Sequence, residues 1–363
     1  MQNLPAILNV AYASNVPLLL WGDAGVGKSA RIEAFGKANG LLTQTIIASI
    51  NEPATFGGFP VQTDGGAALL PTAWAMSLKG TQGILFIDEL TTAPPSVQAA
   101  CLRVINDAVV GDCDMGKGVR RWAAANPPDI AADGSVLAAP LANRFMHITV
   151  RFDLEEWSRG FLNGFAGTGY APPPTGWEAR IPMVRAAIVA FLRRRPALAH
   201  ARPKDAVAGG GAWPSPRSWD MASRVMAVAG AMGVSDDTMH ECIAGCIGDG
   251  AAVEFLAWQR QQDLPDPEAL LSGAAWDVPA DGSKAYATMA SVVACVTSRP
   301  DQARWVRAWD ILIMAHDKGH ADLAVLCARS MAEALVKTGQ YRMPPAATKM
   351  ARLLMAIGGF SSK

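Results

Sequence analysis

The sequence predicts an α/β domain followed by an all-helical region. A short apolar run at 16–21 precedes a glycine-rich turn, and helix-forming residues follow from 30 to 38. Further strand-like apolar runs occur up to residue 150, whereas from 153 onward the apolar residues recur at helical spacing. A chain of 363 residues can hold two domains. We therefore expect an α/β domain over residues 1–152 and helices over residues 153–363.

The composition excludes some classes of protein. Half of the residues are hydrophobic, and Lys plus Arg equal Asp plus Glu at 32 each, so no overall basic charge attracts nucleic acid or an anionic membrane. No apolar run reaches the length of a membrane span, and no secretion signal is recognisable. The six cysteines form no CxxC pattern, so we expect them to pack in the core of a cytoplasmic protein without disulfides.

Residues 22–29 have the G-x-x-x-x-G-K-S spacing of a phosphate-binding loop. Its glycines allow successive backbone N–H groups to point at one anion, and the following helix adds its positive dipole. Lys28 would contact the β- and γ-phosphates, and the Ser29 hydroxyl can bind Mg²⁺. A chance match is the alternative, but the flanking strand and helix argue against it. The expected nucleotide-binding residues are Gly22, Asp23, Ala24, Gly25, Val26, Gly27, Lys28 and Ser29.

A second apolar run, residues 83–87, is followed directly by Asp88 and Glu89. This pattern predicts a buried strand that delivers two carboxylates at its carboxyl end, where ligands bind in open α/β sheets. An ordinary strand that ends in a solvated acidic turn is the alternative. A further strand from 121 ends at Asn126, and a short helix over 137–145 contains Arg144 before a last strand at 147–150.

Two hairpins are expected between these elements. The Asp64-Gly65 pair lies between apolar segments within residues 51–71, and residues 109–119 are rich in Gly and Asp. In the first hairpin, Phe56, Phe59 and Val61 are flanked by glycines. They form either a partner-facing loop or a small local core in which the two phenylalanines pack together.

The helical part contains one possible anion contact. Ser215 and Pro216 predict a helix start, which places Arg217 in the first turn, where a cation opposes the helix dipole. Arg217 therefore either faces an anion or is an exposed charge. The arginines at 193–195 more simply offset the dipole at a helix end. Helices are expected near 154–165, 182–194, 218–232, 237–247, 251–261, 283–296, 300–318, 321–337 and 346–357.

Taken in order, these segments resemble the motifs of AAA+ ATPases of the MoxR-like branch. GDAGVGKS resembles Walker A, ILFIDEL Walker B, AAANPPD the sensor-1 segment, LANRF the arginine-finger segment and SPRSW sensor 2. The resemblance extends from about residue 4 to about residue 232. Loops of this branch commonly contain a proline and end in threonine, whereas here Asp23, Ala24 and Val26 vary the loop and Ser29 ends it.

The resemblance implies a P-loop αβα sandwich with a five-stranded parallel sheet, followed by an all-helical lid and a helical C-terminal extension. Residues of about 51–71 would be the helix-2 insert and residues of about 109–120 the pre-sensor-1 hairpin. The implied cofactors are ATP and Mg²⁺, with the metal held by Ser29 and Asp88. Glu89 would polarise the attacking water, and Asn126 would position that water or touch the γ-phosphate.

The resemblance also implies assembly into a ring. Arg144 would reach the nucleotide of the neighbouring subunit in a homo-oligomer, most often a hexamer. Arg217 would contact the γ-phosphate, either in its own subunit or in the neighbour's. The catalytic residues expected are thus Lys28, Glu89, Asn126, Arg144 and Arg217.

The implied function is ATP-driven remodelling of a protein client, in assembly or metal insertion, with a partner that bears a von Willebrand factor A domain. A nucleic-acid motor, of restriction or helicase type, is the alternative because related branches act so. It predicts basic or aromatic hairpin tips, but the second hairpin offers Asp112 and Asp114 against Lys117. A non-enzymatic binding module would require a silent ATPase, although the acidic, amide and cationic residues are all present.

Overall fold

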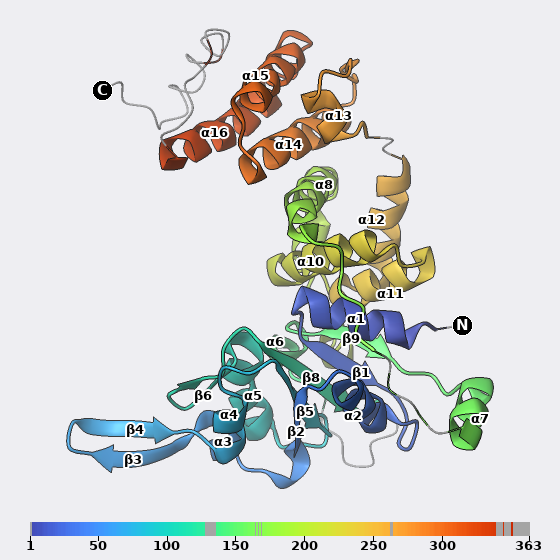
Figure 1. Ribbon diagram of the computed structural model, residues 1–363, viewed down its shortest axis with the longest axis vertical. Coiled ribbons are helices and arrows are strands. Elements are labelled where there is room, and N and C mark those ends of the chain that lie inside the picture. Colours follow the sequence, from blue (N-terminus) through green and yellow to red (C-terminus); the bar gives the residue numbers. More distant parts are fainter. Residues whose placement is uncertain are drawn as a thin grey trace. The chain divides into compact units, whose positions relative to one another are not determined.

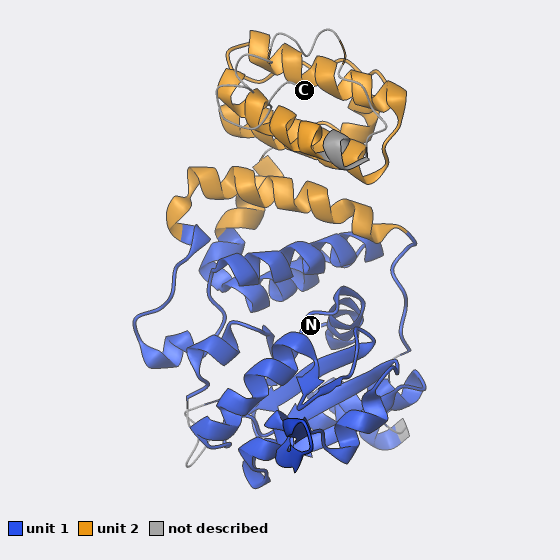
Figure 2. Ribbon diagram, turned by 90° about the vertical axis from the view of Figure 1, so that its left-hand side faces the viewer, with its two compact units in different colours: residues 1–175, 198–253 blue, residues 176–197, 254–363 orange. Residues whose placement is uncertain are grey.

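The computed structural model describes residues 2–127, 136–163, 165, 167, 169–261, 264–338, 344 and 350. The chain divides into two compact units, one of residues 1–175 and 198–253 and the other of residues 176–197 and 254–363 (Figure 2). The domain boundary near residue 152 stays a prediction. Each unit is described separately below.

The first unit is built on a five-stranded sheet in the order β2-β5-β8-β1-β9, in which every neighbouring pair is parallel (Figure 1). This confirms the predicted five-stranded parallel sheet. Because the strands are parallel, their carboxyl ends share one edge of the sheet. The strands are β1 Leu18–Trp21, β2 Leu42–Ile47, β5 Gly83–Asp88, β8 Val119–Ala125 and β9 Met146–Thr149.

Helices cover both faces of this sheet. On one face, Trp122 of β8 packs its ring against Phe35 of α2, with centroids 5.3 Å apart. On the other, Leu85 and Ile87 of β5 belong to one core cluster with residues of α4 and α5. The helices of this unit are α1 Leu4–Ser14, α2 Lys28–Ala38, α3 Pro53–Gly57, α4 Ala73–Leu78, α5 Pro95–Asp107, α6 Ala139–Ala142, α7 Leu154–Asn163, α9 Ala206–Gly209, α10 Pro216–Met232 and α11 Asp236–Ile247, with the 3-10 turn η1 Ala48–Ile50.

Both predicted hairpins are present, and they pack against each other. The first pairs β3 Phe59–Thr63 with β4 Gly66–Leu70, and the second pairs β6 Val109–Val110 with β7 Cys113–Asp114. The Asp112 amide donates to the Leu69 carbonyl at 2.9 Å, and its carboxylate accepts from the Leu69 amide at 3.1 Å. Gly111 has φ +55°, and a Cβ there would lie 2.3 Å from the Leu69 oxygen, so the junction requires glycine.

Phe56 and Phe59 neither pack together in a local core nor both face a partner, which were the two interpretations of the sequence. Phe56 lies on α3, is fully buried and packs against Trp74 with ring centroids 6.3 Å apart. Phe59 begins β3 and is 47% exposed. The helix α3, which the sequence pattern did not predict, turns Phe56 into the core, so only Phe59 and the hairpin itself remain available to a partner.

The second unit is helical and has its own core, in which Trp305 and Trp309 of α15 pack with residues of α14 and α16. The helices predicted between 154 and 337 are present, with ends that agree within about two residues. The short helices α9 and α13 were not predicted, and the helix expected at 346–357 lies outside the described residues. The elements of this unit are η2 Trp177–Arg180, α8 Ile181–Arg194, α13 Pro267–Leu271, α14 Gly282–Ser298, α15 Gln302–Asp317 and α16 Ala321–Thr338; η3 Pro196–Ala199 and α12 Asp249–Gln261 run across the division in sequence.

All six cysteines are free and buried, as expected of packing residues. Burial raises the pKa of the Cys101 thiol to about 12, so this thiol stays protonated at neutral pH. None of the described helices combines the length and apolar character that crossing a membrane requires.

Candidate active site

A pocket opens at the carboxyl edge of the central strands, where the loop after β1 meets the ends of β5 and β8. It is formed by the glycine-rich loop, the first residues of α2, the two acids after β5 and the amide after β8. Its lining residues are Ala24, Gly25, Gly27, Lys28, Ser29, Ala30, Asp88, Glu89, Ala125 and Asn126. The structure therefore brings together sequence-predicted site residues from three separate segments of the chain, the loop at 22–29, the acids at 88 and 89, and Asn126.

The loop has the backbone conformation that its sequence predicts. Gly25 and Gly27 have φ values of +83° and +87°, a region that side-chain-bearing residues rarely adopt. Gly27 is the N-cap of α2, so the amino end of that helix faces the pocket. Exposed N–H groups and the helix dipole make this end favourable for an anion.

Lys28 lies at the first position of α2, with its ammonium group turned back into the loop. It donates to the carbonyls of Gly22 at 2.7 Å and Asp23 at 3.0 Å and to the side-chain oxygen of Asn126 at 2.8 Å. Burial lowers the pKa of Lys28, and the nearby Asp88 and Asp23 carboxylates oppose that shift. The three acceptors hold the cation where a phosphate could replace them.

Ser29 and Asp88 meet directly. The Ser29 hydroxyl donates to a carboxylate oxygen of Asp88 at 2.5 Å. A hydroxyl and a carboxylate are hard oxygen donors of the kind Mg²⁺ prefers, and Mg²⁺ commonly takes only one or two protein ligands beside phosphate and water. The pair therefore fits the predicted metal position. Within the described part of the chain, no group of three or more His, Cys, Asp or Glu residues could hold a metal ion.

Glu89 has an unusual backbone conformation. Its φ is +53°, which is uncommon for any residue other than glycine and costs free energy. The Glu89 amide donates to the Asp88 carboxylate at 2.8 Å, and the Glu89 carboxylate accepts from the Ser49 hydroxyl at 2.5 Å. The turn thus aims the side chain at the pocket, where it is exposed.

The sequence pattern did not single out Ser49. It lies in η1 directly after β2, the neighbour of β5 in the sheet. A polar residue at the carboxyl end of the adjacent strand was the available signal, but strand order cannot be read from the sequence alone.

Asn126 lies at the end of β8, and its backbone carbonyl accepts a hydrogen bond from the Thr91 hydroxyl at 3.1 Å.

Arg144 and Arg217 do not line this pocket. Arg144 donates to the Pro140 carbonyl at the end of α6. Burial lowers its pKa, the positive charge of Arg217 lowers it further, and Asp107 opposes both. Arg217 is exposed at the start of α10, whose predicted Ser215 N-cap and proline at the first position are both present. The two arginines are thus close enough to repel each other, apart from the pocket of their own chain.

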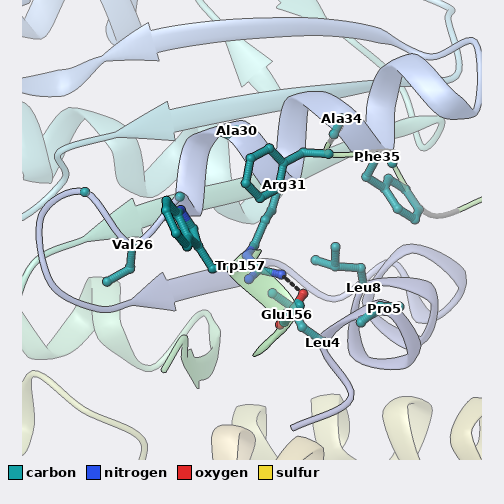
Figure 3. A pocket seen from close by; sticks show the side chains of 14 residues that line it. Leu4, Pro5, Leu8, Val26, Ala30, Arg31, Ala34, Phe35, Glu156 and Trp157 are labelled. Carbon is teal, nitrogen blue, oxygen red and sulfur yellow. Dashed lines mark hydrogen bonds and ion pairs between the residues drawn. The ribbon is translucent and has the colours of Figure 1, made fainter. Parts of the chain in front are cut away.

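A second pocket borders the loop on its other side (Figure 3). It shares Gly25, Gly27 and Ala30 with the first pocket. Most of its remaining lining is apolar, and one ion pair, Arg31 with Glu156, crosses it. The sequence pattern did not predict this pocket. Its other lining residues are Leu4, Pro5, Leu8, Val26, Ala34, Phe35, Trp157, Phe165 and Gly167.

Comparison with known proteins finds one family model that matches the part of the chain around this site. Residues 17–145 match the model of the AAA domain, dynein-related subfamily. A solved structure titled as a putative ATPase from Cytophaga hutchinsonii is similar over 70% of this chain and 88% of its own, with 15% identity and a TM-score of 0.46. No curated protein matches the chain.

Proposed function

We propose that this chain hydrolyses ATP with the help of Mg²⁺; the match of residues 17–145 to the AAA domain model supports the proposal. The observation that carries the proposal is the convergence of Lys28, Ser29, Asp88, Glu89 and Asn126 on one pocket at the carboxyl edge of the sheet. These groups supply a cation, two oxygen ligands, a carboxylate and an amide, which are the parts that phosphoryl transfer uses.

Each residue has a role that its contacts support. The loop amides and Lys28 bind the phosphates, and Lys28 exchanges its carbonyl partners for phosphate oxygens. Ser29 and Asp88 hold Mg²⁺, which when bound neutralises charge on the phosphates. Glu89 orients the attacking water and accepts its proton, while the Ser49 hydroxyl fixes the carboxylate. Asn126, already within hydrogen-bond distance of Lys28, positions the water or the γ-phosphate.

The test is nucleotide binding together with phosphate release. We expect the wild-type protein to bind a fluorescent ATP analogue and to release phosphate with Mg²⁺ but not with EDTA. Lys28→Ala should lose most of the affinity for the analogue. Lys37→Ala, which removes an exposed lysine from the last turn of the same helix, is the matched control. Unchanged binding by Lys28→Ala would contradict the assignment of the loop.

We further propose that the active form is a ring, most simply a hexamer, in which Arg144 and Arg217 contact the nucleotide of the neighbouring subunit. Two observations support this. Neither arginine lines the pocket of its own chain, and their charges lie close enough to lower the pKa of Arg144. Two guanidinium groups whose charges repel each other favour a polyanion between them, because a phosphate relieves that repulsion.

For the biological role, we propose MoxR-like remodelling of a protein client, with a partner that carries a von Willebrand factor A domain. The support is the ordered set of motifs together with the projecting β3–β4 hairpin and its exposed Phe59. The nucleic-acid motor has less support, because such a motor is expected to have basic residues at its hairpin tips. The second hairpin instead has Asp112, whose carboxylate accepts a hydrogen bond from the first hairpin. Stimulation of the ATPase by a protein client but not by DNA would agree with this role.

A further inference from the structure

One segment of the first unit forms a strap beside the second pocket. We define the strap as residues 153–163, 165, 167 and 169–171. Its far end is fixed to α1 and α2: the Tyr170 amide donates to the Asn39 side chain, and the Ala171 amide donates to the Asn9 side chain at 3.0 Å. Gly167 lies so close to α2 that a Cβ there would be 1.9 Å from the Ala34 oxygen.

The near end of the strap is the helix α7, and burial stabilises it little. Leu154, Phe161 and Leu162 are 60%, 67% and 80% exposed. Its start is capped, since the Asp153 carboxylate accepts from the Glu156 amide at 2.9 Å. Trp157 and Glu156 turn toward the pocket (Figure 3). A helix with so much exposed apolar surface opens at a low free-energy cost.

Among the residues that the structure describes here, one ion pair joins this helix to the phosphate-loop helix across the pocket. An Arg31 guanidinium nitrogen lies 2.5 Å from a Glu156 carboxylate oxygen, with side chains 27% and 42% exposed. Arg31 follows Lys28 by three positions and thus lies about one helical turn from it on α2. The pair therefore connects α7 to the helix that bears the phosphate-binding residues.

We propose that the Arg31–Glu156 pair is a latch that holds α7 over the second pocket and slows the release of nucleotide. This inference rests on the proposed function, because the part of the nucleotide beyond the phosphates would extend from the loop into the pocket that shares Gly25, Gly27 and Ala30 with the first. When the pair breaks, α7 moves away and that part of the nucleotide loses one wall of its site. Arg31 and Glu156 are positioning residues in this account, since neither touches the reacting phosphate.

The latch is tested by two measurements on the full chain. The first is hydrogen exchange of α7 without nucleotide, which reports the latch itself. The second is the dissociation rate of a fluorescent ADP analogue in stopped flow. Glu156→Gln removes the ion pair, whereas Glu155→Gln removes an equal charge from the first turn of α7 and leaves the pair intact. The two variants therefore cost α7 similar dipole stabilisation.

We expect Glu156→Gln to speed both exchange and release about two- to fivefold relative to Glu155→Gln, the size of a partly exposed ion pair. Glu155→Gln itself should show only the loss of dipole stabilisation that the two variants share. The charge-swapped double variant Arg31→Glu, Glu156→Arg should restore slow exchange. The ratio of the nucleotide release rate of Glu156→Gln to that of the wild type should fall toward one at high salt, because salt screens the ion pair.

The outcomes separate the latch from the proposed function. If the wild type binds the analogue and Glu156→Gln releases it no faster, the latch is wrong and the proposed function stands. Equal acceleration by Glu155→Gln would also overturn the latch, because helix dipole rather than the pair would then explain the effect. If the wild type binds no nucleotide, the proposed function is wrong and the effect of the pair on nucleotide release is wrong with it, whereas hydrogen exchange still decides whether the pair holds α7.

Discussion

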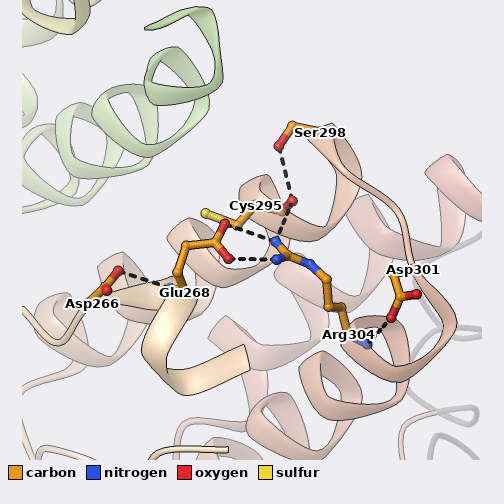
Figure 4. A network of polar contacts seen from close by, with 6 residues as sticks. All are labelled: Asp266, Glu268, Cys295, Ser298, Asp301 and Arg304. Carbon is orange, nitrogen blue, oxygen red and sulfur yellow. Dashed lines mark hydrogen bonds and ion pairs between the residues drawn. The ribbon is translucent and has the colours of Figure 1, made fainter. Parts of the chain in front are cut away.

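Two glutamates, one in each unit, show how differently this chain uses a carboxylate. In the second unit, Glu268 of α13 accepts two hydrogen bonds from Arg304 of α15, at 2.6 and 3.0 Å (Figure 4). The backbone amide of Glu268 donates to the Asp266 carboxylate, and Arg304 also donates to the Cys295 carbonyl. In the first unit, Glu89 has a strained backbone and accepts from a neutral hydroxyl.

The difference separates a structural charge from a reactive one. Hydrogen bonds from Arg304 lower the pKa of Glu268, so its charge is already compensated inside the unit. Glu89, Asp88 and Lys28 instead have hydroxyl, amide and carbonyl partners, which a phosphate, a metal or a water can replace. Strained backbone and neutral partners at one strand end therefore mark the site more clearly than the number of charges does.

The largest expected effect on activity comes from removing the Arg144 guanidinium, which does not line the pocket of its own chain. Arg144→Ala should keep nucleotide affinity and lose phosphate release by about 10³-fold or more, because a cation at the transition state is removed. Arg103→Ala, an exposed arginine on α5, is the control. Mixing Arg144→Ala subunits with Lys28→Ala subunits should restore part of the activity, since an intact pocket then meets an intact arginine. No rescue in mixed assemblies would contradict action between subunits.

The comparison predicts the opposite behaviour for the compensated pair. Arg304→Ala should speed hydrogen exchange in α13 and α15 and lower local stability by about 1–2 kcal/mol, because a bidentate pair is lost. Phosphate release per folded molecule should stay at the wild-type value. Arg329→Ala, which removes an exposed pair with Glu333 one turn away, should cost at most about 0.5 kcal/mol. A fall in activity with Arg304→Ala would break the distinction between the units.

Acid should weaken the two units in different pH ranges. His147 accepts a hydrogen bond from the Trp21 indole at 2.9 Å, and its other ring nitrogen donates to the Ala142 carbonyl at 2.8 Å. Burial lowers the pKa of His147 from 6.5 to about 4. The unfolded chain therefore binds a proton first as the pH falls, so the first unit should lose stability between about 6.5 and 4, by at most about 3 kcal/mol.

The pKa of Glu268 is lowered from 4.5. The contribution of Glu268 to the stability of the second unit should therefore persist until the pH falls below 4.5. Hydrogen exchange of each unit at pH 7, 5 and 4 measures the two ranges, and His147→Asn should remove the upper one. Simultaneous weakening of both units above pH 5 would contradict this assignment.

Much of the first unit could be predicted because its signals are local. The loop at 22–29, the strand before Asp88 and the N-cap at Ser215 each depend on residues adjacent in sequence, and the structure has the loop, the strand and the cap. Ser49, the packing of Phe56 against Trp74 and the Arg31–Glu156 pair could not be predicted. Each depends on which segments pack side by side, which one sequence without strand order does not reveal.

The second unit illustrates the same limit. Helical periodicity predicted α14, α15 and α16, but it gave no indication that α13 exists or that Arg304 pairs with Glu268. The five-residue helix α13 is too short for a periodic pattern, and a charged residue on a helix surface has no signature of its partner.

The most direct test of the central claim is phosphate release by Glu89→Gln beside the wild type, with Glu52→Gln as a control at an exposed position near the same edge. The amide keeps the size of the side chain and its bond to Ser49, but it cannot take a proton from water. The account predicts wild-type affinity for ATP and release slowed by about 10²- to 10⁴-fold. Wild-type turnover by Glu89→Gln would contradict it.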